Sequence, residues 1–447
     1  MKLFFPLEYK SILKLGIPIT IGQLGMTAQN IADNIMVGQH STEELAAAGL
    51  VNNLFVLAIL LALGYSIGAI SQLGALYSQN KKGKMMEIMK SSIIADSLQG
   101  LLIIIVLAGL YFALPHMNQP EELVPLMQPY LLIQIISFPF MFLANPFRQC
   151  TDSINDTSVA MIIMLIGNIW NVFFNYLLIF GKLGFPELGI IGAGWATASS
   201  RVVMFLLFVL VFFFRPKYKE YKEHWNTSPA TKKDVLLLNR LGWPIAIQMG
   251  MEVASFSLVA IFIGWIGTTH LAAHQVMISI SNIVFMSFMG FSNAVSIRVS
   301  NYNGLKDMRG IRHATFAGYE LVIVISIIMS ILAYIFRFHL SGLFTDSPEV
   351  TEIVALCVYA LILYQIGDGM QCTFSNALRG LGDVKKLMHY SFIAYIVISI
   401  PLSYLFGVVM HGGTFGIWMG FPFGLTIAGV LYLRRFLKIT RNDVAKY

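Results

Sequence analysis

The sequence is poor in charge. Asp, Glu, Lys and Arg together make up 12% of the 447 residues, whereas a typical soluble domain has about 25%. Hydrophobic residues make up 57% of the chain, and the mean hydropathy is +0.71. These values exclude an ordinary soluble globular protein and predict an integral membrane protein.

The sequence also lacks the usual marks of a metal centre or of an enzyme. Its three cysteines, Cys150, Cys357 and Cys372, are not in metal-ligand spacing, and their odd number argues against a disulfide framework. The motifs GxxxxGK[ST], HExxH and GxSxG are absent, which disfavours an ATP-driven pump built from this chain alone and the commonest hydrolases. We therefore expect no enzymatic activity and no cofactor.

What the sequence does contain is a series of long apolar segments. They exceed the roughly 20 residues that a membrane-spanning helix needs, and they lack the short alternating pattern of outer-membrane strands. The fold class predicted is all-α and polytopic. Twelve transmembrane helices are expected, at residues 11–38, 45–79, 87–114, 121–148, 157–180, 189–214, 235–266, 270–303, 311–338, 348–379, 386–409 and 415–437.

Lys and Arg are unevenly distributed between the two ends of these segments. Of the 30 residues, 27 lie at the termini or near the loops that follow even-numbered spans, and two lie on the opposite side. The positive-inside rule therefore places both termini in the cytoplasm, together with the polar connection at residues 215–234. The expected location is the plasma (inner) membrane, crossed many times.

The two halves of the chain are repeats. The motif Leu-Gly-x-Pro at residues 15–18 recurs at 241–244, and Gly-x-Ser at 64–66 recurs at 290–292, both with an offset of 226 residues. Six spans per half, an even number, give the halves the same orientation, and such pairs form a cavity between them. We expect two pseudo-symmetric six-helix bundles with a central cavity. The expected domains are an amino-terminal lobe at 1–214, a cytoplasmic linker at 215–234 and a carboxyl-terminal lobe at 235–447.

The carboxylates within the spans are not shared between the halves. Glu252 lies about midway along the apolar segment 241–266, and the repeat offset places Met26 at its equivalent position. Asp33 and Asp368 likewise lack acidic equivalents in the other half. An ionisable group at bilayer depth costs roughly 2.5 kcal/mol or more and is normally tied to function. We interpret these acids as parts of a task that each lobe performs differently.

These acids have no basic neighbour along their own helices. Arg201 is the only Lys or Arg inside a predicted span, so most of the acids must meet a cation from outside, take up a proton or remain hydrated. Both sodium and proton binding are chemically open. By contrast, Asp96 is expected to be hydrated near the cytoplasmic end of its span, and Asp383 is expected to form a loop ion pair with nearby Arg379.

Polar and aromatic residues near the acids leave two alternatives open. Asn168, Asn171 and Asn175 share one side of a helix at spacings of three and four, so they either supply oxygens and hydrogen bonds to Asp33 or join helices. Phe256, one turn after Glu252, and Gln275 either line the cavity or pack between helices.

Three motifs occur together in a characteristic order. They are Gly-Ile-Pro at 16–18 leading to Asp33, Leu-Ala-Ala-His-Gln at 271–275, and Leu-Arg-Gly at 378–380 followed by Asp383. In these motifs and over nearly its whole length, the chain resembles the multidrug and toxic compound extrusion (MATE) family, in particular its NorM-like branch.

The resemblance implies roles for individual residues. Glu252 and Asp368 would bind the coupling cation in the carboxyl-terminal lobe, as metal ligands if that cation is Na⁺, with Tyr364 close to them. A polar site in the amino-terminal lobe would be formed by Asp33, Asn171, Asn175 and Thr197. The substrate cavity would be lined by Asp33, Glu252, Phe256, Gln275 and Asp368.

The function that the resemblance implies is export of cationic amphipathic compounds in exchange for Na⁺ or H⁺ by alternating access. Two other functions stay open at this stage. A flippase for lipid-linked oligosaccharides would want a cationic cavity, for which Arg201 alone is weak support, and a membrane-embedded enzyme would need a reactive pair facing one cavity. The expected partners are small cationic substrates, the coupling ion and the lipid bilayer; no nucleic acid is expected, and the protein is expected to be a monomer.

Overall fold

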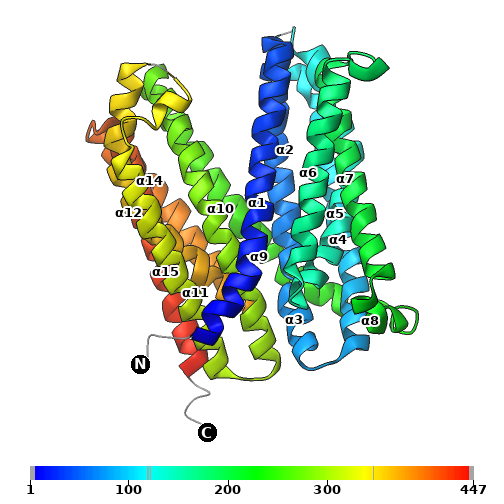
Figure 1. Ribbon diagram of the computed structural model, residues 1–447. Coiled ribbons are helices and arrows are strands. Elements are labelled where there is room, and N and C mark those ends of the chain that lie inside the picture. The colour runs from blue at the N-terminus through cyan, green and yellow to red at the C-terminus, as the bar shows by residue number, and fades with distance from the viewer. Residues whose placement is uncertain (1–5, 118–119, 121, 346, 442–447) are drawn as a thin grey trace. The chain divides into compact units, whose positions relative to one another are not determined.

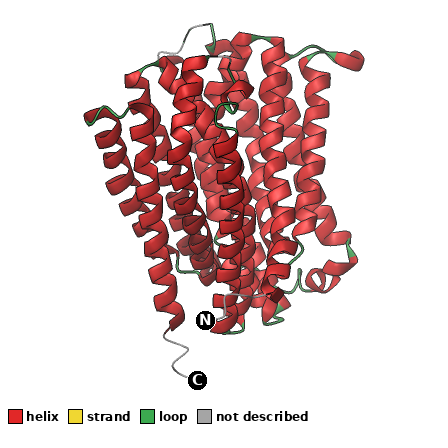
Figure 2. Cartoon of the chain, turned by 60° about the vertical axis from the view of Figure 1, so that its left-hand side comes forward, coloured by secondary structure: helices red, strands yellow, loops and turns green. Residues whose placement is uncertain are grey.

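The computed structural model describes residues 6–117, 120, 122–345 and 347–441. Within these residues the chain consists of helices joined by short connections, with no strand (Figure 2). The all-α prediction is confirmed. Eleven of the described segments are long and apolar enough to cross a membrane, as a multi-pass membrane protein requires.

The helices fall into two successive series. The first series is α1 (Pro6–His40), α2 (Thr42–Ile67), α3 (Ile70–Ser78), α4 (Lys82–Ala113), α5 (Val124–Ser153), α6 (Thr157–Ile179), α7 (Gly189–Phe214) and α8 (Lys219–Glu223). The second series is α9 (Lys232–Ile266), α10 (Thr268–Gly304), α11 (Met308–Ile335), α12 (Pro348–Leu381), α13 (Val384–Ser391), α14 (Ile400–Tyr404) and α15 (Gly413–Arg441). Most of these bounds agree with the predicted spans to within a few residues.

Two predicted spans need comment. The span expected at 45–79 is divided between α2 and α3, and the expected start of the fourth span, residue 121, lies outside the described residues. The first span corresponds to α1, which is not among the eleven apolar segments. With 35 residues, α1 is long enough to cross a bilayer, but it includes charged residues such as Glu8 and Lys14. The twelfth span therefore stays a prediction.

The chain divides into two compact units. The carboxyl-terminal unit contains Met1–Thr20 and Ile247–Tyr447, and the amino-terminal unit contains Ile21–Ala246. The division falls inside α1 and inside α9, at positions 226 residues apart, so each of these helices begins in one unit and ends in the other. The lobes expected at 1–214 and 235–447 were drawn from the connecting loop alone and stay a prediction.

The beginnings of α1 and α9 are each fixed by an ion pair. Glu8 of α1 pairs with Arg298 of α10 at 2.9 Å and accepts a hydrogen bond from Tyr302 in the carboxyl-terminal unit. Asp234 of α9 pairs with Lys84 of α4 at 2.9 Å in the amino-terminal unit. Both pairs hold the cytoplasmic end of a helix in the unit that its second half leaves.

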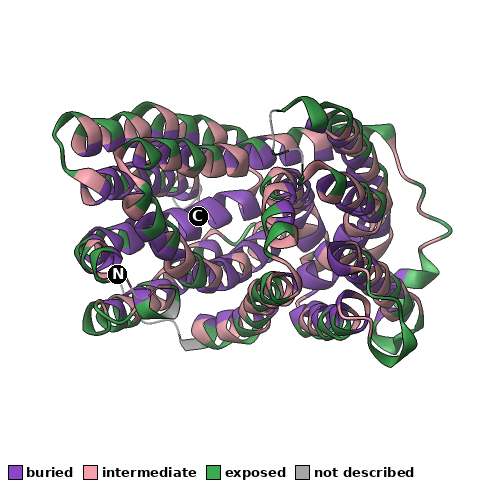
Figure 3. Ribbon diagram, turned by 90° about the horizontal axis from the view of Figure 1, so that it is seen from above, coloured by how far each residue is buried: buried purple, intermediate pink, exposed green. Residues whose placement is uncertain are grey.

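In the amino-terminal unit, α5 packs against α2, α4 and α7, and α6 packs against α7 (Figure 1). Seen from above, the helices are buried along one side and exposed along the other (Figure 3). The exposed sides carry large apolar side chains, such as Ile105, Val106 and Phe112. Apolar exposed faces are stable in lipid, where only the backbone needs internal hydrogen bonds.

In the carboxyl-terminal unit, α12 packs against α10, α11 and α15. The segment between α13 and α15 contains two π-helical stretches, η5 (Phe392–Ser399) and η6 (Leu405–Val409). Gly420 and Gly424 of α15 let this segment come close, because a Cβ at either position would collide with Ser403 or Ser399. Small residues at helix contacts are typical of membrane proteins. This packing brings η5 and its Tyr395 to the buried side of α12.

Candidate functional site

Asp368 is the most deeply buried of the predicted site acids. It lies within α12 and is 1% exposed. Its Oδ1 accepts a hydrogen bond from the Cys372 thiol at 3.5 Å, whereas its Oδ2 has no hydrogen-bond partner among the described residues. In the part of the chain that the structure describes, no Lys or Arg lies within ion-pair distance of it. Because a buried, unpaired charge is costly, this carboxyl needs a proton or a cation.

Glu252, on α9, lies close enough to Asp368 for the two to interact electrostatically. Glu252 is half-buried. Its Oε2 accepts a hydrogen bond from Gln248 Nε2 at 3.4 Å, and the Tyr395 hydroxyl lies within hydrogen-bonding reach. The structure therefore brings together, within one unit, two carboxylates that the sequence separates by more than a hundred residues.

Two tyrosines complete this cluster. Tyr364 lies one turn before Asp368 on α12, is 4% exposed and interacts with both acids. Tyr395, which sequence reasoning missed, accepts a hydrogen bond from Gln371 Nε2 at 2.8 Å. The signal that could have found Tyr395 is the repeat, since an offset of 227 places it opposite Asn168. We call Glu252, Asp368, Tyr364 and Tyr395 the acidic site.

Phe256 and Gln275 lie in different surroundings. The ring of Phe256 stacks on Phe421 at 4.4 Å and meets the edge of Tyr364 at 6.4 Å. Phe256 therefore forms an aromatic wall beside the acidic site. Gln275, on α10, is exposed.

In the amino-terminal unit, a chain of hydrogen bonds connects the four residues of the predicted polar site. Asn175 Nδ2 donates to Asp33 Oδ1 and, at 3.1 Å, to Asn171 Oδ1. Asn171 Nδ2 donates in turn to the Thr197 hydroxyl at 3.2 Å. Neither amide atom of Asn168 has a partner among the described residues. We call Asp33, Asn171, Asn175 and Thr197 the amide site.

Arg201, on α7, lies near the amide site. Its Nη1 donates to the Ser137 hydroxyl at 2.6 Å, and its guanidinium lies over the ring of Phe55 at 5.3 Å. It interacts electrostatically with Asp33. The one arginine that the sequence places within a span is therefore a neighbour of an acid.

The predicted loop ion pair between Asp383 and Arg379 is wrong. Asp383 instead pairs with Arg435 of α15 at 2.6 Å. Arg379 is 4% exposed, and its Nη2 donates to Gln248. The reason is that α12 continues to Leu381, so Arg379 lies on the buried side of a helix. The acidic site therefore has a cationic neighbour that the sequence did not reveal.

The prediction that Asp96 is hydrated is also wrong, because Asp96 is 3% exposed. Helix α4 begins at Lys82 rather than at residue 87, which places Asp96 about four turns from the helix end. Its carboxyl lies within hydrogen-bonding reach of Ser66.

The acidic site offers oxygen ligands. Hard cations such as Na⁺ favour carboxylate, hydroxyl and carbonyl oxygens. No group of three or more His, Cys, Asp or Glu suited to a metal ion occurs among the residues that the structure describes. Glu252 and Asp368 would thus need tyrosine or amide oxygens, such as those of Tyr364 and Tyr395, to complete a coordination shell.

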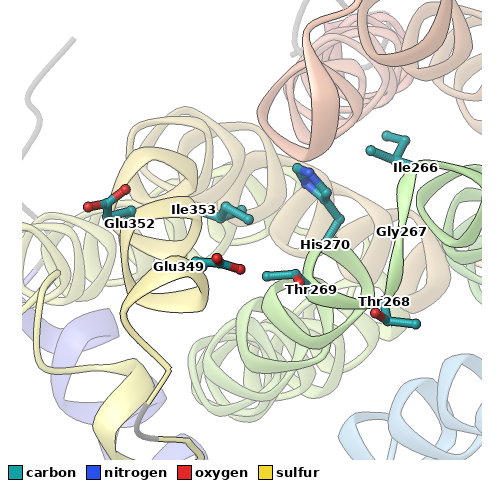
Figure 4. A pocket seen from close by; sticks show the side chains of 8 residues that line it. All are labelled: Ile266, Gly267, Thr268, Thr269, His270, Glu349, Glu352 and Ile353. Carbon is teal, nitrogen blue, oxygen red and sulfur yellow. The ribbon is translucent and has the colours of Figure 1, made fainter.

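A cavity of about 500 Å³ opens elsewhere in the carboxyl-terminal unit, between the turn from α9 to α10 and the start of α12. Figure 4 shows Glu349, Ile353 and Thr269 on its walls. The fourth polar residue, His270, is bonded to the Thr414 hydroxyl at 2.8 Å. None of the predicted site residues lines this cavity.

Comparison with known proteins gives concordant matches. The model of the MatE family matches residues 18–177 and again 244–405. The two matches start 226 residues apart, which is the offset of the internal repeat. A multidrug resistance protein NorM from Aliivibrio fischeri is 30% identical over 439 residues, covering 97% of this chain and 95% of that protein. The NorM of Vibrio cholerae is 29% identical over 441 residues, covering 98% and 96%.

Solved structures share the fold. A MATE protein in the straight conformation has a TM-score of 0.89 at 20% identity, covering 98% of this chain and 97% of that one. A transporter of the MOP superfamily from Pyrococcus furiosus has a TM-score of 0.88 at 21% identity, covering 97% and 96%.

Proposed function

The chain belongs to the MatE family, and from this premise we propose that it is a secondary antiporter that exports cationic amphipathic compounds in exchange for Na⁺ or H⁺. The names of the NorM relatives, multidrug resistance proteins, support drug-like substrates. We further propose that the protein works as a monomer in the plasma (inner) membrane with both termini in the cytoplasm, because Lys and Arg are concentrated on that side.

The observation that carries the proposal is the pairing of Glu252 with Asp368 within one unit. A buried carboxylate without an ion pair binds a proton, a metal cation or a cationic substrate, and each of these excludes the others. Competition of this kind is a coupling free energy between two ligands. A monovalent cation that moves inward gains about 2.3 kcal/mol per 100 mV of membrane potential, which drives the substrate outward.

The other proposed residues have supporting roles. We place Phe256 and Gln275 on the wall of a central cavity between the lobes, since repeats of equal orientation commonly enclose one and alternate its exposure. The amide site, with Asp33 as its acid, provides hydrogen-bonding groups to the same cavity. The aromatic face of Phe256 suits a cationic, flat substrate.

A flippase for anionic lipid-linked sugars is less well supported. Its pyrophosphate would need an uncompensated cation, whereas Arg201 is bonded to Ser137 and lies beside Asp33. No observation favours an enzyme.

The test is efflux of ethidium from proteoliposomes, first with a sodium gradient at clamped pH and then with a proton gradient without sodium. We expect one gradient to drive efflux in the wild-type protein and expect Glu252→Gln and Asp368→Asn to abolish it while the protein stays folded. Efflux at the wild-type rate from either variant would refute the assignment of the acidic site.

A further inference from the structure

Arg379 is a buried cation without a direct carboxylate partner. Its guanidinium donates to Gln248 Oε1 and, at 3.4 Å, to Asn376 Oδ1, and its Nε has no partner among the described residues. No carboxylate of the described part of the chain lies within ion-pair distance of it. Arginine stays protonated in proteins, so this charge must be balanced from farther away.

The balancing charge is Glu252. Gln248 is 0% exposed and lies one turn before Glu252 on α9. Its amide oxygen accepts from Arg379, while its Nε2 donates to Glu252 Oε2. One amide thus connects the guanidinium to the carboxylate with both of its polar atoms used in the correct sense. Arg379 and Glu252 interact electrostatically across this bridge.

The bridge matters because it keeps the charges apart. A direct, bidentate pair between arginine and glutamate would satisfy both partners and would leave Glu252 little reason to bind a cation. With Gln248 between them, Arg379 compensates part of the negative charge while the oxygens of Glu252 stay available.

Resting on the proposed function, we propose that Arg379 is the internal counter-ion of the acidic site and that the site therefore takes up one monovalent cation per transport cycle. With both carboxylates ionised, two negative charges face one positive charge, so the net charge is −1. One Na⁺ or H⁺ brings the site to zero, and a second would leave a positive charge buried, which is costly. The other titratable groups facing the site are neutral in this count: Tyr364, Cys372, Tyr395 and Tyr432.

The test is a set of charge variants of the full-length purified protein. Two probes count cations: radioactive sodium bound at equilibrium, and protons taken up after a jump from alkaline to acid pH. Relative to the wild-type protein, Glu252→Gln should bind one cation fewer and Arg379→Gln one cation more. The double variant Glu252→Gln/Arg379→Gln has the wild-type net charge and should regain the wild-type count.

The matched control is Arg312→Gln. Arg312 is a half-buried arginine of α11 that bonds to Thr440 and does not face the acids, so its count should equal that of the wild-type protein. A structural role for Arg379 would lower the melting temperature of Arg379→Gln but would not restore cation binding to the double variant.

If Arg379→Gln does not fold, Gln248→Glu tests the same arithmetic with Arg379 in place. The added carboxylate makes the net charge −2, so the variant should bind one cation more than the wild-type protein, whereas Gln248→Leu should not. A double variant that folds but stays without the cation, or a Gln248→Glu count equal to the wild-type count, overturns the role of Arg379. Absence of both probes from the wild-type protein would instead refute the proposed function itself.

Discussion

The two units each place an arginine near an acid, but their charge balance differs. In the amino-terminal unit, one carboxylate, Asp33, faces one guanidinium, Arg201, so the amide site is neutral. In the carboxyl-terminal unit, two carboxylates face Arg379, so the acidic site is negative. Since the halves derive from one repeat, the difference shows how duplication separates tasks: one copy offers amide hydrogen bonds, and the other attracts a cation.

The largest expected effect comes from neutralising one acid in each unit. Asp368→Asn should weaken cation binding by about 100-fold or more, because removing one partner of a buried charge costs about 3–5 kcal/mol. The matched variant Asp33→Asn should change cation affinity by less than about threefold, since the long-range interaction that it removes is screened. Sodium and proton binding to the two purified variants measures the contrast. Equal losses in both would mean that the units share the coupling task.

A second variant should erase the difference in charge. Asn171→Asp adds a carboxylate to the amide site, next to Asn175, and changes its net charge from zero to −1. We expect this variant to bind one more cation than the wild-type protein. The same exchange at Asn155, a connecting residue outside the site between α5 and α6, is the control and should leave the count unchanged. An unchanged count in Asn171→Asp would show that net charge alone does not create a cation site.

The smallest effect is expected from Tyr395. Tyr395→Phe removes a hydroxyl within reach of Glu252, and the loss of one hydrogen bond is worth about 0.5–1.5 kcal/mol. Cation affinity should therefore fall by about two- to tenfold, as measured by sodium or proton titration. Tyr390→Phe, a half-buried tyrosine near the start of the same segment, should have no effect. If the two variants bind alike, Tyr395 only packs.

The helices and the acids were accessible from the sequence because their signals are local. Long apolar runs determine the spans, and a charge within such a run marks Glu252, Asp33 and Asp368. The grouping of Asn171 and Asn175 beside Asp33 agrees with their helical spacing, while Thr197 and Tyr364 came from the family resemblance alone.

The parts that the sequence did not reveal depend on contacts between distant segments. Whether Arg379 points toward Asp383 or toward Gln248 depends on how far α12 continues and what packs on it. Tyr395 reaches Glu252 from a π-helical stretch, whose change of phase no apolar pattern indicates. The transfer of the first part of α1 to the carboxyl-terminal unit likewise depends on tertiary contacts, such as that between Glu8 and Arg298.

The most direct measurement is the number of coupling cations bound per wild-type transporter, determined with radioactive sodium and with proton uptake and compared with the same counts for Glu252→Gln. The acidic site, with two carboxylates and one guanidinium, predicts one cation for the wild-type protein and none of it for the variant. Two cations lost together, or a count that Glu252→Gln leaves unchanged, would contradict the account.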